Sequence, residues 1–511
     1  MTAAYDSLGK PTTEKLPGGI VRRHSYDPAG ELVDLSYSGK GTDPDTGQAV
    51  DDQDWFGWSA ESDAAGRTTH EWAPTGGSAY ESGAVRSDRA YSYDKAGRLV
   101  GVDDLTGNDP DTATCQRRSY GFDVNGNRTS QATASNTAAC ADTGATSTTR
   151  AYDAADRPVT GANGQGSYVT DLLGRQTSIP ASDTANPGNG DMALAYYDTD
   201  AAKSVTQGDV NVTWSLDGAG RRLTQTTSQG SVVLGTQTSS SLVRHYTDES
   251  DNPTWSVDTA SGVATSSRYL GLTGDGLGLT VTTTGSDTKA VLDLAGLRGD
   301  IVASTTLTGT DAAGGIDLWG EYTEYGAPTG TTQAGIGYGW LGTHERATLT
   351  SLGITLMGAR LFNQVTGLFT SMDPQYQGGD TAYGYPNDPI NSQDLGGNSW
   401  WTTVVRVTKR MYQRTRGYYA SSYRKMTWAP RQYMNVVRSF VRDGNPYLRI
   451  GRSQGNGEWR VSFGDSRRHW LRRPWIIRQT TRVHVHISRR YGGVDWHWSS
   501  HSVNKTFWRK R

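Results

Sequence analysis

The sequence predicts a mainly β protein of stacked hairpins, followed by a small α+β domain at its C-terminal end. Three observations support this prediction. A corner motif typical of β-hairpins recurs through the first 225 residues. Apolar residues make up only 34% of the 511 residues, while Gly reaches 63, Tyr 26 and Trp 16, a composition that suits short strands with solvated faces. The charge also reverses sign near residue 398, so we expect two bodies of different character.

The corner motif consists of an aromatic residue, Asp, two variable residues, Gly and usually a basic residue. In such a corner Asp accepts hydrogen bonds from turn amides and Gly supplies the positive φ. Copies recur about every 20 to 35 residues, which predicts hairpins that bury their faces only against neighbours. Unrelated β-turns are the alternative, but seven copies disfavour it. The copies are Tyr26–Gly30, Tyr93–Arg98 and Phe122–Arg128, with looser ones at 62–67, 152–157, 171–175 and 216–221.

The stretch from 225 to 340 continues in the same manner, rich in Thr, Ser and Gly, with alternating segments such as Val263–Leu270. More strands are expected there. Clusters of catalytic residue types are lacking, so residues 1–340 are interpreted as architecture. Cys115 and Cys140 could form one disulfide, but so sparse a pair does not establish the redox compartment, and both states stay open.

No apolar run reaches the ~20 residues that a membrane span needs, and Met1–Lys10 lack the pattern of a signal peptide. We therefore expect no integral membrane segment. If the protein is exported, either dedicated secretion machinery carries it or the chain is the end of a longer one with a signal upstream.

The charge reversal divides the chain at residue 398. Residues 398–511 contain 25 Lys and Arg against 4 Asp and Glu, whereas the preceding 397 residues contain 25 against 48. An acidic container that carries a basic effector would have this segregation for electrostatic reasons. The junction at residue 398 is therefore the region where we expect functional residues.

Four motifs precede the junction: Tyr338–Gly342, Gly353–Asn363, Thr366–Pro374 and Ala382–Gly397. Together they resemble the core that ends the shell of RHS/YD-repeat polymorphic toxins. The resemblance implies three parts: YD/RHS repeats at 1–340, the repeat-associated core at 341–397, and a variable toxin domain at 398–511. It further implies a secreted or cell-surface toxin used against competing cells, an effector that acts inside the target cell, and a cognate immunity protein.

In that family the repeats form a hollow β shell, the core plugs it, and an aspartate pair cuts the chain just after the plug. Carried over by motif, the pair is Asp373 and Asp394, and cleavage falls at Gly397–Asn398. Two carboxylates that share a proton can divide the roles of base and acid in amide hydrolysis. With only about 340 residues of repeats, we expect a curved or partial shell, and the chain reads as a fragment of a longer protein.

Departures from the family pattern affect both aspartates. The family usually has Asp-Pro-x-Gly at each, whereas Asp373–Tyr376 reads Asp-Pro-Gln-Tyr and Asp394–Gly397 reads Asp-Leu-Gly-Gly. Met372 stands where the family often has Arg. A purely turn-forming role for both aspartates is therefore the alternative to self-cleavage.

Past Asn398 the pattern changes to helical periodicity and then to alternation. Apolar residues share one helical face in 404–412 and in 433–441, with arginines opposite in the first. Strands follow, and the segments together predict a small α+β domain. The predicted strands are Tyr447–Ile450, Glu458–Phe463, Arg482–Ser488 and Val494–Trp498.

This domain has the composition of a nucleic-acid-binding protein, because its cations can displace phosphate counterions and its nine Trp can stack on bases. Strand alternation places Arg482, His484, His486 and Ser488 on one face. A tight turn at 491–492 would set His486 opposite His497 and Ser488 opposite Asp495.

Three imidazoles and a carboxylate suit phosphodiester cleavage without metal, in which one His takes the proton of a 2′-hydroxyl and another protonates the leaving oxygen. An RNase is therefore favoured, with His484, His486, Asp495 and His497 as catalytic candidates and His501 as a weaker one. The same set could instead hold a divalent metal for DNA hydrolysis; no other cofactor is expected. A solvated sheet face is the plain alternative. Phosphate binding is assigned to Arg482 and Arg490.

Two other functions stay open at this point. The basic, Trp-rich domain could be a non-enzymatic effector that disrupts membranes or binds nucleic acid without cutting it. The whole chain could also be a cell-surface structural or adhesion repeat protein.

Overall fold

The computed structural model divides the chain into two compact units, Met1–Arg414 and Thr415–Arg511. In the first unit the structure describes residues 1–28, 30–42, 48–73, 85–107, 114–136, 140–230, 236–272, 276–308, 311–312, 315–330, 332–333, 337–375 and 379–397. In the second it describes the strand backbone at 446–452, 459–470, 476–487 and 494–499.

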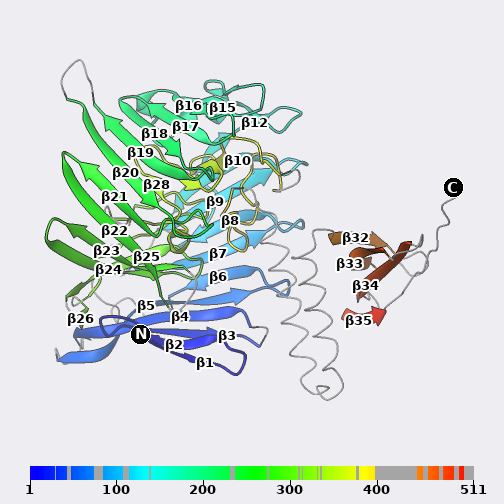
Figure 1. The fold of residues 1–511 in the computed structure, drawn as a ribbon, viewed down its shortest axis with the longest axis horizontal. Coiled ribbons are helices and arrows are strands. Elements are labelled where there is room, and N and C mark those ends of the chain that lie inside the picture. The colour runs from blue at the N-terminus through cyan, green and yellow to red at the C-terminus, as the bar shows by residue number, and fades with distance from the viewer. Residues whose placement is uncertain are drawn as a thin grey trace. The chain divides into compact units, whose positions relative to one another are not determined.

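The first sheet of unit one contains eleven antiparallel strands in chain order, blue to cyan in Figure 1. Each strand pairs with the next along the chain, as the stacked-hairpin prediction requires. The strands are β1 (Thr2–Tyr5), β2 (Pro11–Lys15), β3 (Val21–Tyr26), β4 (Leu32–Thr42), β5 (Ala49–Ser62), β6 (Thr68–Trp72), β7 (Asp88–Tyr93), β8 (Leu99–Asp104), β9 (Cys115–Phe122), β10 (Arg128–Asn136) and β11 (Thr146–Thr149).

A two-stranded ladder, β12 (Ala151–Tyr152) with β13 (Pro158–Thr160), leads to a second antiparallel sheet of fourteen strands. Its order again follows the chain, with its strands coloured from cyan-green to green in Figure 1. The last strand, β27, is the exception, because it pairs with β25. The strands are β14 (Val169–Thr170), β15 (Gln176–Ile179), β16 (Met192–Tyr196), β17 (Ala202–Gln207), β18 (Val210–Leu216), β19 (Arg222–Gln229), β20 (Thr238–His245), β21 (Trp255–Ala260), β22 (Val263–Gly271), β23 (Leu277–Thr284), β24 (Asp287–Ala295), β25 (Ile301–Thr308), β26 (Asp311–Ala312) and β27 (Leu318–Trp319).

A small four-stranded sheet follows, and its inner strands are fully buried. It consists of β28 (Thr348–Leu349), β29 (Ile354–Met357), β30 (Arg360–Asn363) and β31 (Leu368–Phe369). Within the described residues the helical elements are short 3-10 turns: η2 (Ala162–Gly164), η3 (Ala181–Asp183), η4 (Pro187–Asn189) and η5 (Gly342–His344). The predicted mainly β class is therefore confirmed.

The corner motif forms the turn that its residues predict. In the copy that begins at Asp94, the Asp carboxylate Oδ1 accepts hydrogen bonds from the amides of Ala96 (2.8 Å) and Arg98 (3.0 Å). The Gly97 amide donates to the Asp94 carbonyl at 3.0 Å, and Gly97 has a φ of 86°. Arg98 Nε completes the turn with a bond of 2.7 Å to Oδ2 of Asp94.

Consecutive corners are also tied to each other. The guanidinium of Arg67 lies over the ring of Tyr93 at 4.8 Å, and that of Arg98 lies over Phe122 at 4.9 Å. The hydroxyl of Tyr93 then donates to the carbonyl of Thr68 at 2.7 Å. The aromatic residue that opens one corner thus packs on the basic residue of the corner before it, which gives the repeat its physical meaning.

The first hydrophobic cluster joins the start of the first sheet to the end of the second. Tyr37 and Phe56 pack with Leu292, Val302 and Trp319 in one buried cluster. The Tyr37 hydroxyl also donates to the carbonyl of residue 295 at 2.9 Å. The strands β4 and β5 therefore pack against β24, β25 and β27.

Two further clusters bury the segment after β27 against both large sheets. Tyr91 of β7 and Tyr120 of β9 pack with Phe362 and Phe369. Trp214 of β18 packs, in a third cluster, with residues of β29 and β30. The predicted core segment thus contacts the first sheet on one side and the second sheet on another.

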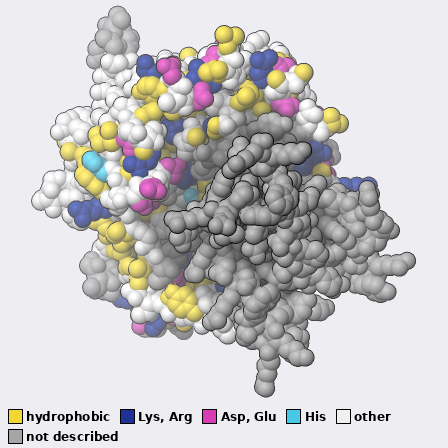
Figure 2. Space-filling view, turned by 45° about the vertical axis from the view of Figure 1, so that its right-hand side comes forward, with side chains coloured by type: hydrophobic (Ala, Val, Ile, Leu, Met, Phe, Trp, Pro, Cys, Tyr) yellow, Lys and Arg dark blue, Asp and Glu magenta, His cyan; other side chains and the backbone are white. Residues whose placement is uncertain are grey.

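Cys115 of β9 forms a disulfide with Cys140, with 5.4 Å between their Cα atoms. Over the described stretches, none of the helical elements is long or apolar enough to cross a membrane. On the face seen in Figure 2, acidic and basic side chains of the described residues are interspersed among apolar ones.

In the part of the second unit that the structure describes, four antiparallel strands pair in chain order: β32 (Pro446–Arg452), β33 (Trp459–Trp470), β34 (Ile476–Ile487) and β35 (Val494–Ser499). Each overlaps one predicted strand. The two helices predicted at 404–412 and 433–441 lie outside the described residues.

Candidate functional site

A buried arginine lies at the centre of the candidate site. Arg360 is the first residue of β30, directly after the turn from β29, and its side chain is only 2% exposed. Its guanidinium lies over the ring of Phe369 at 3.6 Å. A charge buried this deeply among apolar strands needs acidic or carbonyl partners.

Both predicted aspartates bind this arginine. Nη2 of Arg360 donates to Oδ2 of Asp373 at 3.1 Å and to Oδ2 of Asp394 at 2.9 Å. The two carboxylates are themselves 5% and 7% exposed. Burial lowers the pKa of Arg360, and the two aspartates oppose this effect. The structure thus brings together two positions 21 residues apart; their role in cleavage stays a prediction.

Asp373 also forms a local turn, as the alternative prediction for this residue states, and it binds Arg360 at the same time. Its Oδ1 accepts the amide of Gln375 at 2.8 Å, while its own amide donates to the carbonyl of Ala382 at 2.9 Å. One carboxylate oxygen therefore fixes the turn, and the other faces Arg360.

The two glycines before the predicted cleavage point contact the same turn. The carbonyl of Gly396 accepts the amide of Ala359 at 3.1 Å, and the carbonyl of Gly397 accepts Nε of Arg360. Gly397 has a φ of 63°, and a Cβ there would clash with the carbonyl of Met357. Only glycine meets both requirements without strain. Asn398 lies outside the described residues.

In this arrangement a single arginine contacts both a peptide carbonyl and two carboxylates. One guanidinium binds the carbonyl of Gly397 with Nε and two carboxylates with Nη2. A cationic donor at a carbonyl oxygen stabilises the negative charge that develops there when a nucleophile attacks.

Sequence reasoning missed Arg360. The signal was present, because Arg360 is the single charged residue in the apolar run from Ile354 to Phe362. A lone charge in such a run predicts a buried ion pair, although not which acid it binds.

The positions of His484, His486 and His497 share one side of the sheet in the second unit, but their pairing differs from the prediction. His484 is opposite His497, and His486 is opposite Asp495, whereas His486 was expected opposite His497. The pairing is wrong by two residues because Ile487 pairs with Val494, so residues 488–493 link the strands instead of a two-residue turn.

A shift of two preserves strand alternation, so these positions still lie on one side of the sheet. Arg482 is opposite Ser499 on that side. Ser488, Arg490 and His501 lie outside the described residues.

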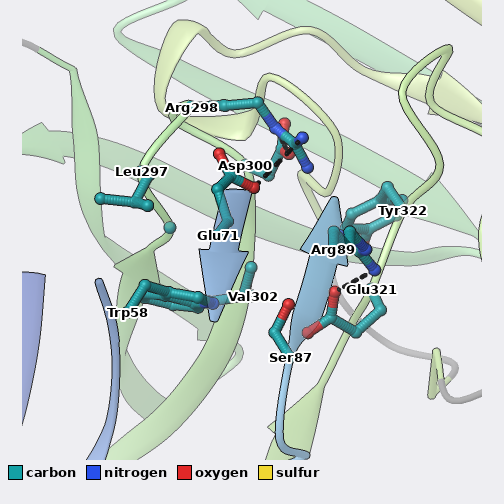
Figure 3. A pocket seen from close by; sticks show the side chains of 11 residues that line it. Trp58, Glu71, Ser87, Arg89, Leu297, Arg298, Asp300, Val302, Glu321 and Tyr322 are labelled. Carbon is teal, nitrogen blue, oxygen red and sulfur yellow. Dashed lines mark hydrogen bonds and ion pairs between the residues drawn. The ribbon is translucent and has the colours of Figure 1, made fainter. Parts of the chain in front are cut away.

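A pocket in unit one is lined by charged side chains from both large sheets (Figure 3). Arg89 Nη2 donates to Glu321 at 2.7 Å, and Arg298 lies 3.6 Å from both Glu71 and Asp300. Burial raises the pKa of Glu321 and of Asp300. Because its acids face arginines across the junction of the sheets, we interpret this pocket as a structural ion-pair network.

Fold and site together define a large, open, antiparallel β-repeat protein with a buried core segment that ends in an Arg–Asp–Asp cluster. No family model and no curated protein matches the chain.

Among solved structures, the TcdB2–TccC3 complex matches with a TM-score of 0.57 and 15% identity over 78% of this chain and 20% of that one. The same complex without the hypervariable C-terminal region gives a TM-score of 0.59 at 15% identity, over 78% and 19%. The Photorhabdus luminescens Tc holotoxin pore with a TccC3 mutation gives the same four values. The chain spans about a fifth of the length of these chains, and the likeness shows a shared fold.

Proposed function

We propose that this chain belongs to an RHS-type toxin, in which a β-repeat wall and core (residues 1–340 and 341–397) carry an effector (residues 398–511) released by self-cleavage at Gly397–Asn398. The corner repeats and the fold shared with the TcdB2–TccC3 toxin complex support the class. One of the similar structures is described as lacking a hypervariable C-terminal region, and the charge of this chain reverses at residue 398, before its own last 114 residues. The observation that carries the proposal is the binding of Asp373, Asp394 and the Gly397 carbonyl by Arg360.

In the proposed reaction one carboxylate of the pair takes a proton from water, and the water oxygen bonds to the carbonyl carbon of Gly397. Arg360 stabilises the resulting oxyanion through Nε. The other carboxyl group gives its proton to the nitrogen of Asn398 as the C–N bond breaks. The products are a carboxylate at Gly397 and a free amine at Asn398.

The test is the fragment pattern of the purified full chain on a denaturing gel. Wild type is expected to yield two fragments, whereas Asp373→Asn and Asp394→Asn are expected to remain intact. Asp287→Asn is the matched control, because Asp287 is exposed in β24. An unchanged two-fragment pattern in both aspartate variants would exclude the reaction, and mass spectrometry of the new N-terminus decides the cleaved bond.

For the effector we propose a nuclease, with RNA as the favoured substrate. Its support is the shared side of His484, His486, Asp495 and His497 in the sheet, together with the cationic excess of the domain. Arg482 and Arg490 would bind phosphate. A divalent metal held by the same histidines would instead favour DNA hydrolysis.

Incubation of the cleaved protein with RNA and with DNA, each with and without chelator, separates these mechanisms. We expect RNA loss that persists in chelator and disappears in His484→Ala and His486→Ala. His469→Ala is the matched control, because His469 pairs with Ile477 at the other end of β34. Leakage of dye from anionic liposomes without loss of RNA would favour the membrane-disrupting alternative.

The proposed setting follows from the class. The protein would be secreted or displayed at the cell surface, and the effector would act inside a competing cell after delivery by secretion machinery. A cognate immunity protein, acidic to match the cationic effector, would protect the producer. Co-expression of that partner should abolish the toxicity of the effector domain.

A further inference from the structure

Three arginines cluster where the second sheet meets the core segment. Arg222 begins β19, Arg244 is near the end of β20, and Arg346 follows the turn η5. They are 9%, 6% and 6% exposed. An arginine is seldom buried this deeply unless it is paired with an acid.

Only one of the three has a carboxylate partner among the described residues. Arg346 binds Asp251 through two bonds of 2.6 and 3.0 Å. The acceptor of Arg222 is the carbonyl of Gly358 at 2.5 Å. The acceptor of Arg244 is Oε1 of Gln225 at 2.8 Å. Two buried guanidinium charges thus have neutral acceptors only.

Each of these arginines also has donor atoms left over. Arg222 Nε and Nη2, Arg244 Nη1 and Arg346 Nε are buried and make no hydrogen bond. A buried donor without an acceptor costs about 1–3 kcal/mol, and more when the group is charged. A ligand with several acceptor oxygens could accept hydrogen bonds from all four of these donors.

The arginines are close enough to repel one another. Burial, followed by the positive charges of Arg244 and Arg346, lowers the pKa of Arg222 to about 10. Two acids lie near the cluster: Asp251 is bound to Arg346, and burial raises the pKa of Glu345, whose buried Oε2 makes no hydrogen bond, to about 7. The cluster therefore keeps a net positive charge at neutral pH.

We infer that Arg222, Arg244 and Arg346 form a binding site for a tetrahedral oxyanion of the phosphate or sulfate class. Such an anion offers several acceptor oxygens at once and can bind donors from three guanidinium groups. The site stands independently of the proposed self-cleavage. It adjoins the turn between β29 and β30, which also contacts the end of the core segment. Arg222 donates to the carbonyl of Gly358, and the amide of the next residue, Ala359, donates to the carbonyl of Gly396.

The test measures binding of inorganic phosphate to the full chain by equilibrium dialysis, with chloride at matched ionic strength as the reference. We expect one phosphate per chain, displaced by sulfate, and a thermal midpoint that rises with phosphate until saturation. Arg244→Gln should weaken binding about tenfold or more, because it removes a charge-assisted donor. Arg268→Gln, at an exposed position of β22, should bind as wild type does.

A second variant guards against misfolding of the first. Asp251→Asn removes the one carboxylate that competes for Arg346, so it should bind phosphate more tightly than wild type. The inference would be overturned if phosphate and sulfate bind wild type no more strongly than chloride does and raise its thermal midpoint no further. Equal losses in Arg244→Gln and Arg268→Gln would overturn it as well, because they would place the anion elsewhere.

Discussion

The Nε of Arg360 donates a hydrogen bond to the carbonyl oxygen of Gly397, the last described residue before the charge of the chain reverses. The same guanidinium binds two aspartates through another nitrogen. One side chain therefore links the carbonyl that would be attacked to the groups that would move the protons, and substitutions there are informative.

Arg360→Lys should slow self-cleavage by about 100-fold or more, which is the typical effect of losing one oxyanion donor. An ammonium cannot bind the carbonyl and both carboxylates in the geometry of a planar guanidinium. The rate is measured as the appearance of the two fragments over time. Arg268→Lys should cleave like wild type, and a normal rate in Arg360→Lys would rule out a role for the guanidinium.

Gly397→Ala should block cleavage while leaving the wall folded. The residue has a φ of 63°, and an added Cβ would meet the carbonyl of Met357 and lie 3.1 Å from the amide nitrogen of Arg360. The peptide must then move away from Arg360. Gly188→Ala is the control, because a Cβ there has no atom within 4 Å. Cleavage of Gly397→Ala at the wild-type rate would contradict the assigned bond.

Local chemistry explains which parts could be predicted from the sequence. The corners were predictable because Asp and Gly, three residues apart, make the turn by themselves, as Asp94 and Gly97 do. That Asp373 and Asp394 belong to one site was expected only through a family resemblance, since nothing in their spacing brings them to the same arginine.

The rest depended on contacts between distant segments. Arg222 and Arg346 are 124 positions apart, and their shared cluster follows from the packing of the core on the second sheet. The pairing of His484 with His497 depended on the length of the link between β34 and β35, which alternation alone does not give.

Asp94→Ala should lower the thermal midpoint of unit one. The substitution removes the acceptor of two turn amides and the partner of Arg98, a loss of about 1–2 kcal/mol. Calorimetry measures the midpoint, with Asp287→Ala, at an exposed strand position, as the control. Equal midpoints for the two variants would mean that the corner bonds do not stabilise the stack.

The stability of unit one should fall as pH rises toward 7 because of Glu345. Burial raises the pKa of its carboxyl from 4.5 to about 7 in the folded chain. The folded state therefore holds this proton more tightly than the unfolded state. Its contribution is complete below pH 4.5 and is lost as pH rises through 7, an effect of at most about 3 kcal/mol.

Glu345→Gln keeps the neutral form at every pH and should flatten this part of the profile. The measurement compares thermal midpoints at pH 5 and pH 8 for wild type, Glu345→Gln and Glu249→Gln, the last at an exposed position. We expect the thermal midpoint of Glu345→Gln to be higher than that of wild type at pH 8 and equal to it at pH 5. Only at the higher pH does wild type carry a buried carboxylate at this position. If the midpoint of Glu345→Gln differs from that of wild type by the same amount at pH 5 and at pH 8, the carboxyl does not titrate in this range.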